Sequence, residues 1–307
     1  MSESPLFSIV IANYNYGRFL EDAIKSVIAQ GMGTKVELII CDAASTDNSV
    51  DIIKKYANGL PPNVTFYDWI NSPNHNSQTP PLITWWCSEK DGGQSAAFNK
   101  GFSHARGRFL TWLNADDVLL PGALAAVEKE IQRHPEDEWF VGSMVKYDAE
   151  MKLTQYFRAH KFSAVRAKWV FLSAGGPSSF FTKRLLDAVG GVDESLHLMM
   201  DIDLWYKFYR LGHVKYRRTT RPVWGFRVHP ESKMSGKEVD TDIERKKKAI
   251  QKSREERMKM WSRYSLNTES FRSKIATMIS LSIIDKLVDI WVTWRYKGTS
   301  WPQECLK

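Results

Sequence analysis

The first sixty residues alternate between apolar strands and amphipathic helices, and this alternation restricts the fold more than any other feature. Residues 7–12 form a nearly continuous apolar run, and apolar residues then recur at helical spacing over 20–28. A second apolar run, 36–41, is followed by Ser45 and Thr46, which predict a helix cap before the next helical pattern. Strands joined by helices predict a parallel, doubly wound α/β sheet that binds its ligand at the carboxyl ends of the strands.

The rest of the chain continues this pattern and then changes to a different C-terminal segment. We expect a short strand over 64–67 within a loop over 59–84, a helix over 94–104, a strand over 108–113, a helix from about 121 to 134, strands over 139–147 and 180–182, and helices over 183–189 and 201–211. Residues 235–307 instead predict a charged helix followed by a second helix from about 273 to 294. The sequence therefore predicts an α/β domain over 1–234 and a helical appendage over 235–307.

Composition and charge exclude several classes of protein. The three cysteines, Cys41, Cys87 and Cys305, lack metal-binding spacing and indicate reduced thiols. The N-terminus does not resemble a signal peptide, and no apolar run approaches the roughly 20 residues that span a bilayer, so we expect a cytoplasmic protein. Residues 242–263 carry nine Lys or Arg against four acids and thus most of the net charge of +8. One basic element argues against a nucleic-acid partner.

Two acidic motifs suggest a single site. Asn114-Ala115-Asp116-Asp117 follows the apolar run 109–113, so Asp116 and Asp117 could offer oxygens to a divalent cation on a diphosphate. Asp201 opens a predicted helix and could take a proton from an attacking hydroxyl. The alternatives are a solvated turn for the first motif and a helix N-cap for Asp201. Together the two motifs supply what transfer of a sugar from a nucleotide diphosphate requires.

These motifs belong to a longer set that resembles the family-2 glycosyltransferases, inverting enzymes of the glycosyltransferase-A fold, of the type that builds bacterial cell-surface glycans. The similar stretches are 8–15, 37–47, 88–101, 105–110, 113–117, 180–183, 189–196 and 200–205, within 6–232. The resemblance implies a mostly parallel central sheet flanked by helices, with a C-terminal helical appendage. It also implies a nucleotide-binding half over 1–117 and an acceptor half over 118–234.

The resemblance further implies roles for single residues. The nucleotide and donor sugar would be held by Ala12, Asn13, Tyr14, Asp42, Asp91, Gln94, Asn114 and Asp116. Within this set, Tyr14 would lie against the base, and Asp42 would accept a hydrogen bond from the base or ribose unless it is only a turn residue. Asp116, Asp117 and His229 would hold Mn²⁺ or Mg²⁺, although a lone His is also often structural. Asp201 would be the general base.

Two positions depart from the family's usual pattern. Asn114 stands where the family often has an acid, so one negative charge is missing beside the expected metal. Met200 stands where a Glu usually precedes the base, although Asp201 itself is retained. These departures leave the general base in place and reduce the charge available to a metal.

The sequence thus predicts an inverting, metal-dependent glycosyltransferase. It would move a sugar from a nucleotide-diphosphate donor, a UDP-sugar by default, to a hydroxyl of a saccharide or lipid-linked glycan. One alternative is a non-catalytic sugar- or nucleotide-binding module on the same fold. Another is a sugar-1-phosphate nucleotidyltransferase. That class normally has a Gly-rich basic loop after the first strand, whereas residues 13–18 contain a single glycine, Gly17. The lack of a Gly-x-Gly-x-x-Gly after that strand argues against a dinucleotide-binding dehydrogenase.

The C-terminal segment lies outside the resemblance and leaves two interpretations open. Its second helix carries an apolar stripe, which consists of Ala276, Ile279, Ile283, Leu287, Ile290 and Trp294. The stripe could pack on the catalytic domain or on a second subunit, which we favour. Alternatively, residues 242–294 could lie on an anionic bilayer surface at the inner face of the membrane, where lipid-linked acceptors are found. The sequence leaves the oligomeric state open.

Overall fold

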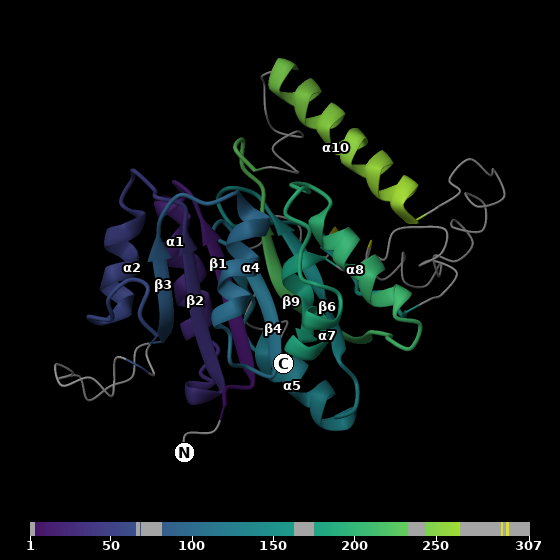
Figure 1. Ribbon diagram of the computed structural model, residues 1–307, viewed down its shortest axis with the longest axis horizontal. Helices are drawn as coiled ribbons and strands as arrows, with labels where there is room; N and C mark the ends of the chain where they lie inside the picture. Colours follow the sequence, from purple (N-terminus) through teal and green to yellow (C-terminus); the bar gives the residue numbers. More distant parts are fainter. Residues whose placement is uncertain are drawn as a thin grey trace.

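The computed structural model describes residues 4–65, 68, 82–162, 175–232 and 243–264, together with residues 290, 293 and 294. The strands are β1 (Phe7–Asn13), β2 (Val36–Asp42), β3 (Ile83–Ser88), β4 (Phe109–Asn114), β5 (Val118–Leu119), β6 (Trp139–Tyr147), β7 (Leu153–Phe157), β8 (Ser179–Thr182) and β9 (Arg217–Arg227). The α-helices are α1 (Gly17–Ile28), α2 (Ser49–Ala57), α4 (Gln94–His104), α5 (Ala123–Arg133), α7 (Lys183–Ala188), α8 (Met200–Arg210) and α10 (Ile243–Tyr264). These elements form one sheet with helices on both faces (Figure 1).

The first part of the sheet is parallel, as the sequence predicts. Its strand order is β3-β2-β1-β4, and every residue of β2 is buried. Helices cover both faces, so these strands are apolar on both sides rather than alternating. The register pairs Asn13 with Asp42 and Ala12 with Asn114. Polar residues from three separate strand ends therefore meet at one edge of the sheet.

The second part of the sheet is mixed. β8 is antiparallel to both β4 and β6, β9 is parallel to β6, and β5 and β7 add antiparallel pairs. β5, β7 and β9 were not among the expected strands. β9 contains Arg217, Arg218 and Arg221, so it lacks the apolar run that marks β1 and β2. Residues 64 and 65 of the expected short strand are not in a strand, and residues 66 and 67 lie outside the described residues.

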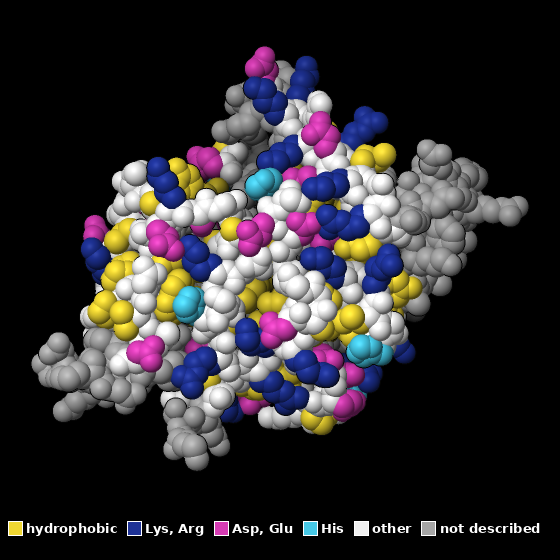
Figure 2. All heavy atoms as spheres, in the orientation of Figure 1, with side chains coloured by type: hydrophobic (Ala, Val, Ile, Leu, Met, Phe, Trp, Pro, Cys, Tyr) yellow, Lys and Arg dark blue, Asp and Glu magenta, His cyan; other side chains and the backbone are white. Residues whose placement is uncertain are grey.

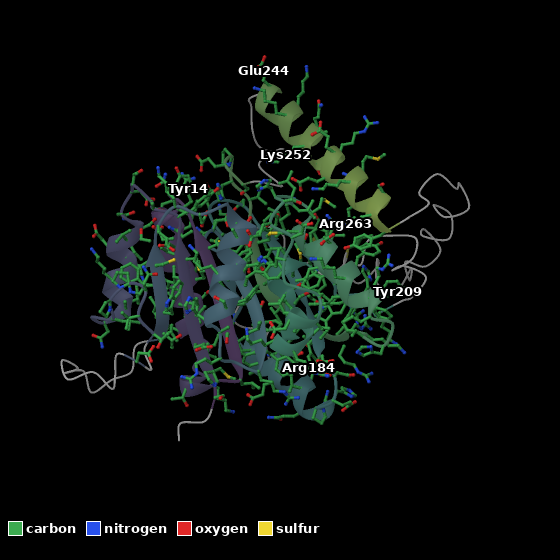
Figure 3. All side chains as sticks on the ribbon, in the orientation of Figure 1. Tyr14, Arg184, Tyr209, Glu244, Lys252 and Arg263 are labelled. Carbon is green, nitrogen blue, oxygen red and sulfur yellow. The ribbon has the colours of Figure 1, made fainter. Side chains whose placement is uncertain are left out.

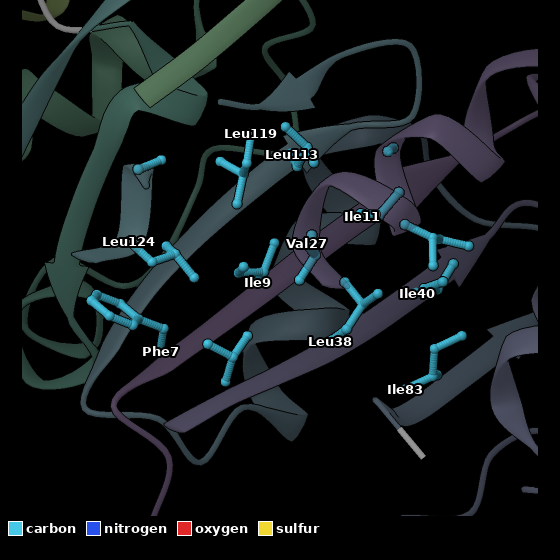
Figure 4. Close-up of a cluster of buried hydrophobic side chains, with 14 of the residues drawn as sticks. Phe7, Ile9, Ile11, Val27, Leu38, Ile40, Ile83, Leu113, Leu119 and Leu124 are labelled. Carbon is cyan, nitrogen blue, oxygen red and sulfur yellow. The ribbon is translucent and has the colours of Figure 1, made fainter. Parts of the chain in front are cut away.

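Side chains on opposite faces of β1 build two separate cores. Phe7, Ile9 and Ile11 pack with α1, α2 and α5, in the cluster that Figure 4 shows. Val10 points to the other face and packs with Phe98 of α4 and with α7 and α8. The alternation of side chains along a strand explains this division. The helices on the second face include α8, which carries Asp201.

α10 confirms the expected charged helix, and it lies above α8 in the view of Figure 1. The expected boundary near 234 falls within 233–242, outside the described residues, and so does most of the second predicted helix. Residues 290, 293 and 294 of that helix are helical, and the hydroxyl of Thr293 accepts a hydrogen bond from the backbone N–H of Tyr156 at 3.0 Å. Among the described residues, no helix has the length and apolar character needed to span a membrane.

The surface of the molecule carries charges of both signs. Lys and Arg side chains are interspersed with Asp and Glu over the face in Figure 2.

Candidate active site

A cavity of about 820 Å³ opens at the carboxyl ends of β1 and β4. Eight of the residues singled out in the sequence line it, namely Ala12, Asn13, Tyr14, Asp91, Gln94, Asn114, Asp116 and Asp201. Residues from the two halves of the domain, far apart in the chain, therefore share one cavity. Asp42, Asp117 and His229 were also expected in the site but lie behind its wall.

Asp42 organises the wall of the cavity rather than facing into it. Its carboxylate is 1% exposed and accepts hydrogen bonds from the Asn13 amide at 2.7 Å and from the Ser88 hydroxyl at 2.6 Å. It also accepts from the backbone N–H of Ser45 at 3.0 Å and from the Ser45 hydroxyl at 2.5 Å. These protein donors occupy both oxygens. The expected direct bond from Asp42 to a base or ribose thus gives way to support of the surrounding loops.

The loops after β1 and β2 form the end of the cavity where Tyr14 lies. The Tyr14 side chain is 59% exposed, so its ring is open to stack on a flat ligand. Ala43, Ala44 and Thr46 line the same end, although the sequence marked only Thr46 among them, and that as a helix cap. Ala44 has a φ of 56°, an unfavourable conformation for a residue with a Cβ, and such residues cluster at functional sites. The short side chains leave room there, but no sequence signal distinguishes them.

A chain of hydrogen bonds joins the middle of the cavity to the interior. The Gln94 amide donates to the Asn114 carbonyl at 2.9 Å, and the Asn114 amide donates to the Asp117 carboxylate at 2.7 Å. This chain explains why position 114 holds an amide. An aspartate there would have no proton to donate and would place a second negative charge beside a buried carboxylate. Nearby, Asp91 accepts from the backbone N–H of Gly93 at 2.8 Å.

Asp117 joins β4 to β9 and does not face the cavity. Its side chain is fully buried, and its second oxygen accepts from the backbone N–H of Arg227 at 3.0 Å. Burial, reinforced by the Asp116 charge, raises the pKa of the Asp117 carboxyl well above its usual range. The structure gives no support to its expected role as a metal ligand. Asp117 instead fixes the turn that carries Asp116.

Asp116 and His229 form the part of the expected metal site that the structure brings together. The Nε2 atom of His229 lies 3.1 Å from an Asp116 oxygen, and its Nδ1 atom lies 3.3 Å from Glu231. His229 is buried against Phe19, with ring centroids 4.6 Å apart, while Asp116 lines the cavity. Oxygen and imidazole donors suit Mn²⁺, and two protein ligands leave positions for phosphate oxygens and water. The two side chains therefore fit a divalent metal.

Tyr16 lies beside this pair and was not singled out in the sequence. It lines the cavity, and its hydroxyl donates to the backbone carbonyl of Glu231 at 3.1 Å. Burial, and then the charge of Asp116, raise the pKa of Tyr16 to about 12. The phenol therefore stays protonated at neutral pH and acts as a hydrogen-bond donor.

One other group in the described residues has three side chains close enough to share a metal: His134, Glu136 and Asp137. It follows α5, and none of its members lines the cavity. Asp137 is also paired with Arg217. This cluster therefore has no part in the candidate active site.

Asp201 lies in the first turn of α8 and lines the cavity together with Met200, His197 and Leu198. One of its oxygens accepts from the backbone N–H of Ile202 at 2.8 Å. Burial raises the pKa of the Asp201 carboxyl to about 6, which brings a carboxylate base closer to neutral pH. Trp205, one turn later, is fully buried and stacks on Trp112 with centroids 5.7 Å apart, so α8 is anchored to β4 beneath the cavity.

The family model described as Glycosyl transferase family 2 matches residues 8–187, more than half of the chain. The chain belongs to this family. Membership confirms the expected family and fold class. The match covers the Asp116 turn and ends before Asp201.

Individual relatives are more distant. The chain is 27% identical over 161 residues to the minor teichoic acid biosynthesis protein GgaB of Bacillus subtilis. The aligned region covers 52% of this chain and 16% of GgaB. The chain superposes on S. aureus TarS in complex with UDP with a TM-score of 0.54 and 19% identity, over 76% of this chain and 62% of that one. It also superposes on a mannosyltransferase of Pyrobaculum calidifontis in complex with GDP-Man and Mn²⁺, with a TM-score of 0.50 and 21% identity. This superposition covers 72% of this chain and 56% of the mannosyltransferase chain. The chain spans 32% and 16% of the length of the first two curated relatives that it matches.

Proposed function

We propose that this chain is an inverting, metal-dependent glycosyltransferase in which Asp201 is the general base. The observation that carries the proposal is that Asp116 and Asp201, from the two halves of the domain, line one cavity. The first lies beside an imidazole at the carboxyl end of β4, and the second has a raised pKa. The cavity therefore offers separate places for a diphosphate and for an attacking hydroxyl.

The donor nucleotide would occupy the end of the cavity formed by the loops after β1 and β2. Tyr14 would stack on the base, and Asn13, held by Asp42, would present a fixed polar edge. Asp91, Gln94 and Asn114 line the middle of the cavity, where the ribose and the donor sugar would lie. Lys90 also lines this region and would contribute a positive charge toward phosphate.

Asp116 and His229 would hold the metal, and Asp117 would support them from behind. A bound Mn²⁺ or Mg²⁺ would neutralise the charge that develops on the departing nucleoside diphosphate. The buried imidazole, 3.1 Å from an Asp116 oxygen, keeps the Asp116 carboxylate in place beside the cavity. The neighbour that was solved with Mn²⁺ supports a metal in this fold.

Transfer would be a single displacement on the acceptor-half side. Asp201 takes the proton from the acceptor hydroxyl as that oxygen bonds to the anomeric carbon of the donor sugar. The bond from this carbon to the phosphate oxygen breaks at the same time, and the nucleoside diphosphate leaves with the electron pair. Attack opposite the leaving group inverts the anomeric carbon, so no covalent sugar–enzyme intermediate is required.

The donor base and the acceptor are proposed from the comparisons. UDP is the default because the TarS structure holds it, whereas the archaeal neighbour holds GDP-Man. The relative from teichoic acid biosynthesis favours a saccharide or lipid-linked acceptor of the cell envelope. Such an acceptor would be met on the cytoplasmic side, with peripheral membrane contact through 242–294.

Thermal unfolding with UDP, GDP, dTDP or CDP, each with and without Mn²⁺, tests this proposal. A nucleotide that binds the native state raises the melting temperature by mass action. We expect one nucleotide to give a shift that needs Mn²⁺ and that disappears in Asp116→Ala, while Asp137→Ala, in the carboxylate cluster outside the cavity, keeps it. If no nucleotide shifts the wild-type transition, or if Asp116→Ala keeps the full metal-dependent shift, the proposed donor site is wrong.

A further inference from the structure

α8 begins without a side-chain cap of its own. Its N-cap residue is Met199, whose side chain makes no capping hydrogen bond. The first N–H groups of a helix have no partner inside the helix, and backbone N–H groups in the loop before it also need acceptors outside the helix. The backbone of His197, Leu198 and Met199 therefore requires an acceptor, one turn or less before Asp201.

Glu256 of α10 supplies this acceptor from a distant part of the chain. Its carboxylate accepts the backbone N–H of His197 at 3.1 and 3.2 Å to its two oxygens, of Leu198 at 2.7 Å and of Met199 at 3.2 Å. The Glu256 side chain is almost fully buried, at 7% exposure. A buried carboxylate that accepts several N–H bonds at a helix N-terminus is held by both the hydrogen bonds and the helix dipole.

Further contacts keep α10 in register with α8. Arg263 donates to Asp203 at 2.8 Å and pairs with Asp193 at 2.7 Å, and the Tyr264 hydroxyl donates to Asp203 at 2.8 Å. Met260 is fully buried in a cluster with Met199 and with residues of α8. Figure 3 shows Arg263 at the end of α10 that lies against α8 and Glu244 at the other end. Because these contacts hold α10 against α8, the Glu256 side chain is kept in position to accept hydrogen bonds from residues 197–199.

The capped segment forms part of the cavity wall. His197, Leu198, Met200 and Asp201 all line the cavity, so the backbone that Glu256 holds carries the residues that would face the acceptor. From the other side, the Ser95 hydroxyl on α4 donates to the Leu196 carbonyl at 2.6 Å. The segment before Asp201 is thus held between α4 and α10.

We infer that Glu256 is a positioning residue for sugar transfer, which caps α8 from α10 and so fixes Asp201 at the cavity wall. This inference rests on the proposed role of Asp201. It makes the C-terminal helix part of the catalytic unit, although α10 contributes no residue to the lining of the cavity. The donor end, built from the loops after β1 and β2, does not depend on α10.

The test compares Glu256→Ala and Glu256→Gln with Glu255→Gln, which removes the same charge from the exposed face of the same helix. Glu256→Gln keeps the shape of the side chain but replaces one acceptor oxygen with a donor group, so it serves if the alanine variant does not fold. We expect turnover to fall about 10- to 100-fold in both Glu256 variants, as for a displaced catalytic group. The KM for the donor should stay within twofold of the value for Glu255→Gln. The rise in melting temperature that the nucleotide causes should match that of Glu255→Gln.

Amide hydrogen exchange separates this inference from the proposed function. Exchange over 197–203 should become faster in the Glu256 variants and stay unchanged in Glu255→Gln, whether or not transfer is observed. Faster exchange with turnover equal to the control would overturn the positioning role, and unchanged exchange would overturn the cap itself. An inactive wild type would instead contradict the proposed function and leave the cap to be decided by exchange alone.

Discussion

The protonation state of Asp201 links the stability of the protein to its proposed catalysis. Burial raises the pKa of this carboxyl to about 6, whereas in the unfolded chain it ionises near pH 4. The folded protein therefore has its full stability from this site below about pH 4 and loses it as the pH rises through about 6. The proposed base must be ionised to accept a proton. Ionisation of this buried carboxyl at neutral pH therefore lowers the free energy of unfolding.

Asp201→Asn should therefore stabilise the fold at high pH. A pKa difference of about two units corresponds to about 2–3 kcal/mol as an upper limit. We expect urea unfolding at pH 8 to show the variant as more stable than wild type by about 1–2 kcal/mol. The difference should shrink as the pH falls and vanish below about pH 3, where the carboxyl is protonated in both the folded and the unfolded state. A difference that is equal at the two pH values would show that burial of Asp201 has no electrostatic cost.

Some residues of the site could be placed from the sequence, and the roles of others could not. The strand ends at Asn13, Asn114 and Asp116 could be placed together because parallel strands bring their carboxyl ends to one edge. The roles of Asp42 and Asp117 could not be predicted in the same way. Both are carboxylates at strand ends, and only the surrounding donors, which come from distant segments, turn them into supports of the site. Glu256 lies even farther away and within a charged run that would suggest only a solvated helix.

At the scale of elements, α10 is docked on one side and solvated on the other. Met260 is fully buried, whereas Met258, two positions earlier, is 55% exposed. Lys247, Lys248, Lys252 and Arg254 are exposed as well. α10 therefore packs on α8, whereas packing of the apolar stripe over 276–294 stays a prediction because most of that stripe lies outside the described residues. The same helix keeps a basic face that could meet an anionic surface.

The matched pair Met260→Ala and Met258→Ala tests whether docking of α10 stabilises the fold. Removing a buried methionine side chain costs about 2–5 kcal/mol, while an exposed change usually stays within about 0.5 kcal/mol. We expect Met260→Ala to lower the free energy of unfolding by about 2 kcal/mol or more. Denaturant unfolding of both variants gives the comparison. Equal effects of the two substitutions would mean that α10 adds no packing energy.

Across the whole molecule, the cavity depends on two halves with different strand arrangements. The parallel half supplies the loops that we propose for a nucleotide, and the mixed half, with α8, supplies the proposed base. The alternating apolar runs predicted the first half because its strands are buried on both faces. They did not predict β9, whose arginines interrupt the pattern, although β9 carries the backbone N–H that fixes Asp117. Long-range pairing of this kind leaves little trace in local sequence.

Asp201 and the Asp116 site are proposed to perform different steps of sugar transfer within one cavity. The most direct test is sugar transfer by Asp201→Asn, with the nucleotide sugar that the thermal shifts select, in the preparation used for metal-dependent nucleotide binding. Loss of a general base costs about 10²- to 10⁴-fold in rate, so we predict a loss in this range with nucleotide affinity unchanged. Transfer within a few-fold of wild type, or no transfer by the wild type with any nucleotide sugar, would contradict the account.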